Sequence, residues 1–212
     1  MKTLLKNAII IAAESPYHHQ KKDVLINDGK IEKIADSIIK SLDTNVIELE
    51  NLHISCGWFD TSVSFGEPGF EERETIKNGL EVASKSGFTA VAVNPNTNPV
   101  IDSKSDIYFL INKSNFSATK LFPIGALTQK CEGQELAELY DMKKAGAIAF
   151  GDYNKPISND NLMKIGLLYA QNFNGLIMSF PKNNSIAAQG IVNEGINSTK
   201  LGLKGIPSLS EH

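Results

Sequence analysis

The stretch that decides the fold runs from Thr89 to Pro99 and reads TAVAVNPNTNP. Its first five residues are apolar or β-branched, with no alternation between polar and apolar positions, and the run LIM at residues 176–178 has the same character. Strands of a parallel sheet that is buried on both faces have this composition. We therefore expect the polar residues after Val93 at the carboxyl end of a buried strand, where βα proteins carry their chemistry.

Strand-like runs of this kind recur about every thirty residues, which is the length of one βα unit. Apolar residues at helical spacing lie between them, and Ser103 with Asp106 three positions later predicts the start of the second helix. The pattern predicts five βα units, either in an open doubly wound sheet or as part of a (β/α)8 barrel. The strands are expected to begin near Trp58, Thr89, Thr119, Ala147 and Leu176, and the helices to bury Ile76, Leu80 and Ala83; Ile107, Leu110 and Ile111; Leu136, Leu139 and Tyr140; and Leu162, Ile165 and Tyr169.

The first fifty residues have a different character, with short β-type runs and no helical pattern. Residues 27–29 (NDG) separate two of these runs and predict a hairpin, because Gly29 adopts a positive φ at little steric cost. A further short strand is expected at residues 45–49. The apolar run at residues 8–13 resembles a short signal peptide, but its β-branched isoleucines favour a buried strand. We expect a small N-terminal β-sandwich portion at residues 1–52 and a barrel portion at residues 53–212.

The composition argues against several classes of protein. Of the 212 residues, 42% are hydrophobic and 21% are charged, and the formal net charge is −3, as in ordinary globular proteins. No apolar run approaches the ~20 residues of a membrane-spanning helix, so no membrane role is expected. Arg73 is the one arginine among 21 basic residues, which argues against nucleic-acid binding. Cys56 and Cys131 have no metal-ligand spacing and are expected as free thiols in the cytoplasm.

Five segments together resemble the dihydroorotase branch of the cyclic amidohydrolases, metal-dependent hydrolases that include allantoinase and hydantoinase. The stretch GWFDTSVSFGEPGF at residues 57–70 is similar to the family pattern PGxxDxHxHFREPG. NPNTNP at 94–99 is similar to MPNTxP, and FGDYNKP at 150–156 is similar to FSDDGKP. The remaining matches are VLINDGKI at 24–31 and, near the end, NEG at 193–195 with LGLKGIP at 201–207. The order and spacing of the five segments make the resemblance specific, and it covers nearly the whole chain.

The resemblance implies a (β/α)8 barrel with one or two zinc ions at the strand ends and a β-sandwich built from both termini. In that family a metal-bound hydroxide attacks a ring amide, because zinc lowers the pKa of bound water to about 7. Ser62 and Ser64 stand where the family has the HxH histidines, Gly66 where it has a substrate-binding arginine, and Ser179 where it has a later metal histidine. A serine hydroxyl is a poor zinc ligand, so no cofactor is expected.

A few polar residues of the family site remain. Asp60 and Asp152 are the remaining carboxylates, with Glu67 as a further one; Asp152 is the candidate catalytic residue, and Asn96 matches a substrate-contacting asparagine. The family's metal-binding aspartate corresponds either to Asp152 or to the position of Tyr153. Each survivor also has a structural interpretation: Asp60 can accept hydrogen bonds from backbone amides, Asn96 belongs to a proline-rich turn, and Asp152 can cap the next helix. We expect the structural interpretation, because no base or metal remains for these residues to serve.

These observations lead to three hypotheses. The leading one is a dihydroorotase homologue without catalytic activity that acts as a structural or regulatory partner, either of aspartate carbamoyltransferase or by self-association. The alternative is an active cyclic-amide hydrolase of the dihydroorotase, allantoinase or hydantoinase type with a non-standard metal site. A third is a module that holds a dihydropyrimidine through Asn96 without reaction. Because a complete barrel takes ~250 residues, five units also predict that the chain is a fragment or is completed by another chain.

Overall fold

The computed structural model describes residues 1–211, so His212, the last residue of the predicted barrel portion, lies outside the described part. The chain divides into two compact units, Met1–Gly57 and the part from Trp58 onward, and each is described by itself. The expected boundary at residue 52 falls earlier than this division. The reason is that β5 (His53–Ser55) pairs with β1 (Lys2–Ile11) in parallel and so extends the sheet of the first unit.

The first unit is a five-stranded mixed sheet. Its path runs β3-β2-β1-β4, and β5 also pairs with β1. The predicted hairpin is confirmed, because β2 (Lys21–Asn27) and β3 (Lys30–Ala35) are antiparallel and joined by Asp28 and Gly29, both at positive φ. The predicted strand near residue 45 is β4 (Thr44–Glu48), which runs parallel to β1. Residues 8–11 of the signal-like apolar run form the end of β1, and residues 12 and 13 follow the strand.

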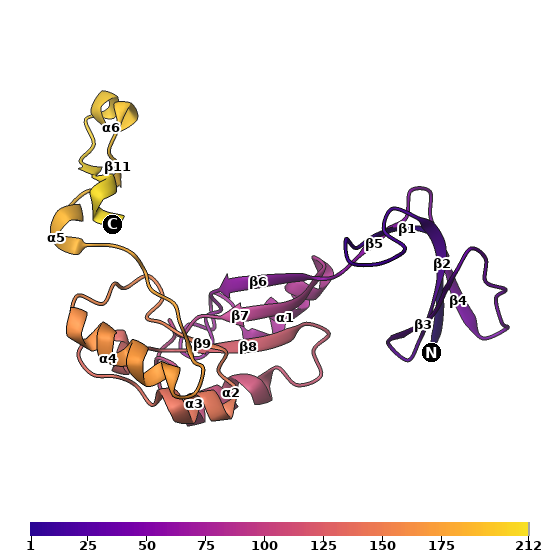
Figure 1. The fold of residues 1–212 in the computed structure, drawn as a ribbon, viewed down its shortest axis with the longest axis horizontal. Coiled ribbons are helices and arrows are strands. Elements are labelled where there is room, and N and C mark those ends of the chain that lie inside the picture. The colour runs from indigo at the N-terminus through magenta and orange to yellow at the C-terminus, as the bar shows by residue number, and fades with distance from the viewer. Residues whose placement is uncertain (212) are drawn as a thin grey trace. The chain divides into compact units, whose positions relative to one another are not determined.

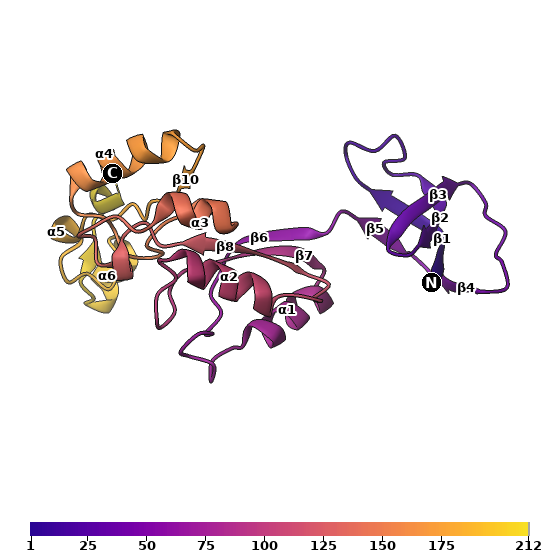
Figure 2. The ribbon, with the colours of Figure 1, turned by 90° about the horizontal axis from the view of Figure 1, so that it is seen from below.

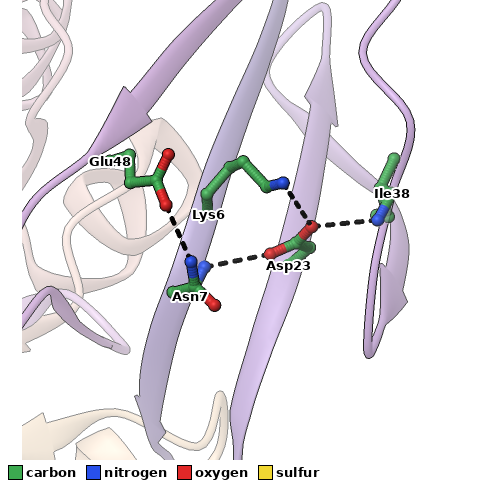
Figure 3. Close-up of polar contacts among 5 residues, drawn as sticks. All are labelled: Lys6, Asn7, Asp23, Ile38 and Glu48. Atoms are coloured by element: carbon green, nitrogen blue, oxygen red, sulfur yellow. Dashed lines mark hydrogen bonds and ion pairs between the residues drawn. The ribbon is translucent and has the colours of Figure 1, made fainter.

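A buried carboxylate joins the strands of this unit (Figure 3). Asp23 on β2 is 2% exposed, and its two oxygens accept hydrogen bonds from the backbone N–H groups of Asn7 and Ile38, each at 2.9 Å. Lys6 Nζ lies 3.7 Å from the same carboxylate, and the Asn7 side chain donates to Glu48. Burial by itself raises the pKa of Asp23, but the two backbone hydrogen bonds and the Lys6 charge outweigh it and lower that pKa below its usual value.

The second unit is a curled half-barrel of five parallel strands in chain order, as Figures 1 and 2 show. The fold class expected from the βα repeat, a partial (β/α)8 barrel, is confirmed. Helix α1 (Ile76–Lys85) contacts β7, α2 (Lys104–Lys113) contacts β8 and α3, and α4 (Asp160–Gln171) contacts β10. The strands are β6 (Trp58–Val63), β7 (Phe88–Val93), β8 (Lys120–Gly125), β9 (Ala149–Phe150) and β10 (Leu176–Ile177), and the other elements are η1 (Gln129–Cys131), α3 (Leu139–Ala145), α5 (Asn184–Ala187), β11 (Val192–Asn193), α6 (Ile196–Leu201), β12 (Gly205–Ile206) and η2 (Ser208–Glu211).

The core of this unit lies between the sheet and the helices. The predicted capping box is present at α2, where the Asp106 carboxylate accepts hydrogen bonds from the backbone N–H and the hydroxyl of Ser103. Thr75 caps α1 through its side chain. Apolar side chains of the first three helices meet those of the strands in one cluster, whose largest fully buried members include Ile76, Leu80, Ile107, Leu110, Leu139, Met142 and Phe150.

Three details of the predicted helices are wrong, and one of them is that Tyr140 on α3 is 41% exposed instead of buried. The third helix begins at Leu139, and Leu136 lies before it in a β-bridge with Thr128. In α4 the small residues Gly166 and Ala170 face the sheet, whereas Ile165 and Tyr169 are 46% and 42% exposed. Within residues 1–211 little covers the opposite face of the helix.

The structure contains no candidate for a membrane-spanning helix among residues 1–211. Its longest helix, α4, has 12 residues, and none of the described helices combines the length and the hydropathy that a bilayer requires.

Candidate functional site

A cavity of about 330 Å³ opens at the carboxyl ends of the parallel strands. Each strand of the half-barrel contributes to it, either with its last residues or with the residues that follow it. We call it the strand-end cavity; it is lined by Ser62 from β6, Asn94 after β7, Ile124 from β8, Gly151, Tyr153 and Asn154 after β9, and Met178, Ser179 and Phe180 after β10. Strand ends that are far apart in sequence thus converge on one space.

Two asparagines after β7 form hydrogen bonds to two serines, Ser62 in β6 and Ser64 just after that strand. Asn94 is buried, and its Nδ2 donates to Ser62 Oγ at 3.0 Å and to the Val63 carbonyl at 3.1 Å. Asn96 Nδ2 donates to Ser64 Oγ at 2.6 Å. Of these four polar side chains, Ser62 and Asn94 line the strand-end cavity, whereas Asn96, the predicted substrate contact, does not. Sequence reasoning missed Asn94, although its position directly after Val93 was a usable signal.

Asp152 is turned away from the strand-end cavity and holds the loop after β8. Its Oδ1 accepts hydrogen bonds from the backbone N–H groups of Leu127 and Thr128 at 2.9 and 3.0 Å, and its Oδ2 accepts one from the Thr128 hydroxyl. It lines a separate cavity together with Cys131. Burial raises the pKa of the Cys131 thiol to about 12, and the neighbouring Asp152 charge adds to this effect. Asp152 was expected to cap the next helix, but the structure shows that Asn159 caps α4.

The other two carboxylates also serve local structure. Asp60 Oδ1 accepts from the Ser62 backbone N–H at 3.0 Å, and its side chain lines a hollow beside α1 that Ser64 shares. Glu67 is buried; its Oε2 accepts from the first backbone N–H of α1, that of Ile76, at 3.0 Å, and its Oε1 lies 2.9 Å from Lys113 Nζ. Neither residue lines the strand-end cavity.

Gly66 occupies a position where no side chain fits. A Cβ placed there would lie 1.9 Å from the Phe70 carbonyl oxygen and 3.0 Å from that of Glu74. The loop is closed in this form by two backbone hydrogen bonds, from Gly66 N–H to the Glu74 carbonyl and from Phe70 N–H to the Gly66 carbonyl, both at 2.9 Å. An arginine at this position would therefore require the loop to open.

The strand-end cavity is lined by hydroxyl, amide, phenol and apolar groups. Among residues 1–211, no three or more His, Cys, Asp or Glu side chains are grouped so that they could hold a metal ion. The described histidines, His18, His19 and His53, all belong to the first unit. The arrangement can donate and accept hydrogen bonds, but the described residues that line the cavity include no imidazole or carboxylate to act as a base.

Comparisons with known proteins place this chain in a family. Residues 53–212 match the family model described as Dihydro-orotase-like. A protein named Dihydroorotase from Pelotomaculum thermopropionicum is 39% identical over 211 residues, which is 100% of this chain and 49% of that relative. One from Syntrophotalea carbinolica is 37% identical over 214 residues, again covering 100% of this chain and 49% of the relative. The chain thus spans about half the length of these curated relatives.

Solved structures support the same fold at low sequence identity. The L-hydantoinase (dihydropyrimidinase) from Arthrobacter aurescens superimposes with a TM-score of 0.71 at 16% identity, over 87% of this chain and 42% of that one. The crystal structure of a dihydroorotase gives 0.58 at 14% identity, over 84% of this chain and 50% of that one. The half-barrel, the converging strand ends and the family match together show that this chain belongs to the dihydroorotase-like family.

Proposed function

We propose that this chain is a dihydroorotase homologue that does not hydrolyse dihydroorotate and that acts as a structural or regulatory partner. The observation that carries the proposal is the set of side chains at the strand ends, where Ser62 and Ser179 supply hydroxyl groups and where residues 1–211 place no imidazole or carboxylate in the cavity lining. Zinc is held by imidazole nitrogen, thiolate or carboxylate, so this donor set does not fit a zinc ion.

The hydrogen bonds of Asp152 support the same proposal. Both of its oxygens are already used by three donors of the loop after β8, so a metal ion at this carboxylate would have to displace bonds that hold buried backbone. The closed loop at Gly66 adds a second argument, because it removes the place where an arginine could bind a substrate carboxylate.

Exposed apolar side chains favour a role in association. Within the described residues β10 is paired on one side only, with β9, and Leu176 on that strand is 60% exposed. Leu168 and Tyr169 on the neighbouring α4 are exposed as well. Open strand edges and apolar patches of this kind are typical of surfaces that further polypeptide covers, either within a longer chain or in a partner. The partner implied by the family resemblance is aspartate carbamoyltransferase, and a second copy of the chain is the other candidate.

The alternative function is an active cyclic-amide hydrolase with a non-standard metal site. The observation that favours it is the 37–39% identity to relatives named Dihydroorotase. Under this alternative a carboxylate such as Asp152 would have to exchange its loop hydrogen bonds for a metal ion when substrate binds.

Metal content and turnover separate the two functions. We expect the dialysed chain to retain far less than one zinc per chain by elemental analysis and to leave dihydroorotate unchanged with added Zn²⁺, Mn²⁺ or Co²⁺. The relative from Pelotomaculum thermopropionicum, prepared in the same way, is the control. Stoichiometric zinc, or turnover that disappears in Asp152→Ala while that variant stays folded, would overturn the proposal. Light scattering, alone and with aspartate carbamoyltransferase, tests the partner.

A further inference from the structure

We infer that the loop between β1 and β2 is a pH-sensitive switch, which is closed while the His18 imidazole is neutral and opens when that ring takes up a proton. The loop covers residues 12–20, and we call it the β1–β2 loop. Its basis is a hydrogen bond in which His18 Nδ1 accepts from the backbone N–H of Ala12, at 3.1 Å. The inference concerns the first unit and goes beyond the proposed function, which rests on the second.

Backbone hydrogen bonds bring the His18 ring to the Ala12 N–H. His19 N–H donates to the Ile10 carbonyl at 2.8 Å and so joins the two ends of the β1–β2 loop. Within the loop, Ser15 N–H donates to the Ala12 carbonyl at 2.9 Å, and His18 N–H donates to the Ser15 carbonyl at 3.1 Å. Two successive turns thus fold the loop back on itself, and the imidazole completes the closure.

The Ala12 N–H depends on this ring for its partner. Among residues 1–211 it makes no other hydrogen bond. A backbone N–H needs an acceptor, either in the protein or in water. Ala12 and His18 are both half-buried, so the N–H finds its acceptor inside the closed loop and can reach water once the loop opens.

Only one form of the imidazole can make this hydrogen bond. Since His18 Nδ1 accepts, its lone pair must be free and the ring hydrogen must sit on Nε2. A protonated ring carries an N–H on both nitrogens, so a donor would then face the Ala12 donor. Histidine is the side chain that changes its charge between about pH 5 and pH 8. The closed loop is therefore tied to a proton equilibrium in this range.

The surroundings of His18 do not offset a positive charge on it. The ion pairs among residues 1–211 include neither His18 nor His19. The two rings lie with their centres 3.8 Å apart, so a charge on each would repel the other. The other titratable groups on the loop and its neighbouring strands are Glu14, Tyr17, Lys21, Lys22, Asp36, which pairs with Lys22, Glu50 before β5 and His53 on β5.

Nuclear magnetic resonance of the 212-residue chain, labelled with ¹⁵N, tests the switch. At about pH 8 we expect His18 as the Nε2–H tautomer, read from the couplings between ring protons and ring nitrogens. The protection of the Ala12 amide against solvent exchange should fall about tenfold between about pH 8 and pH 5, the factor that one hydrogen bond contributes to an opening equilibrium. The Ile9 amide, which donates to the Leu52 carbonyl at 2.8 Å, should keep its protection.

Two asparagine variants separate the neighbouring histidines. In His18→Asn, the side-chain Oδ1 takes the position of Nδ1 and accepts without titrating, so Ala12 protection should no longer change with pH. His19→Asn is the matched control, because the φ of His19 is 60° and asparagine tolerates this left-handed backbone. It should keep the pH response. His18→Ala should leave the Ala12 amide weakly protected at both pH values.

Three results would overturn the inference: a His18 ring hydrogen on Nδ1 at about pH 8, Ala12 protection that is the same at both pH values, or an unchanged pH response in His18→Asn. Loss of Ile9 protection together with that of Ala12 would show that the unit unfolds as a whole, which also overturns a local switch. These readouts do not depend on metal content or turnover, so the inference and the proposed function fail independently.

Discussion

Replacing Asp152 tests directly whether this carboxylate serves structure or chemistry. In Asp152→Ala, the backbone N–H groups of Leu127 and Thr128 lose their acceptor, and both lie in buried surroundings. A buried donor without a partner costs about 1–3 kcal/mol, so two of them cost about 2–6 kcal/mol. Water that enters the adjoining cavity of about 330 Å³ will solvate part of this loop, which favours the lower half of that range.

Asp152→Asn is the milder variant of the same test. Its side-chain oxygen can still accept from the two backbone N–H groups, and the Thr128 hydroxyl can turn to accept from the new amide. The loss is then the difference between charged and neutral hydrogen bonds, about 1–2 kcal/mol. Glu132→Gln is the matched control, because Glu132 lines the same cavity and its side chain makes no hydrogen bond to the described residues. It should change stability by less than about 0.5 kcal/mol.

Urea unfolding followed by circular dichroism gives the free energies, and hydrogen exchange at residues 126–133 localises the effect. We expect the free energy of unfolding to fall most in Asp152→Ala, less in Asp152→Asn and least in the Glu132→Gln control. The Leu127 and Thr128 amides should exchange faster in both Asp152 variants. A fully stable Asp152→Ala chain with unchanged exchange would refute the structural role. If such a chain also lost an activity of the wild type, Asp152 would be a catalytic residue.

Three further predictions concern other parts of the chain. Because the pKa of Asp23 is lowered in the folded chain, this carboxylate stabilises the fold above its unfolded pKa of about 3.9, and the stabilisation is lost as pH falls through the folded pKa. In urea unfolding, Asp23→Asn should therefore lose less stability than wild type between pH 6 and pH 3. Equal losses in the two chains would contradict this. Gly66→Ala should destabilise by about 1–3 kcal/mol, whereas Gly195→Ala, with no atom within 4 Å of the added Cβ, should be nearly neutral in the same assay. Asn159→Ala should cost about 1 kcal/mol through loss of the α4 cap, and a thermal unfolding curve that matches wild type would count against that cap.

The βα repeat could be predicted because its signals are local. The apolar run before Asn94 and the capping box at Ser103 each lie within a few residues, and the structure has β7 and α2 at those places. The buried face of α4 could not be predicted in the same way. Periodicity favoured Ile165 and Tyr169, but the residues of α4 that the structure buries are Gly166 and Ala170. Which face of a helix is buried depends on the elements that pack against it, and the sequence pattern of the helix does not specify those elements.

The candidate site was predictable in place but not in detail. Sequence order alone put polar residues at the strand ends, and the strand-end cavity lies there. It did not show that Asn94 lines this cavity while Asn96 is bonded to Ser64, because the two asparagines have the same spacing signals. The register of β6 against β7 shifts between Asp60 and Val63, and register decides which side chains face a cavity.

The sequence by itself determined the alternation of strands and helices, the hairpin of the first unit and the family, since these depend on short-range patterns and on residue identity. The tertiary structure alone decided what the surviving carboxylates do. Asp152 meets donors that lie 24 and 25 residues away, and Glu67 meets Lys113 on another element. Hydrogen-bond partners brought together by folding, and not the residue type, set whether a carboxylate is left available for chemistry.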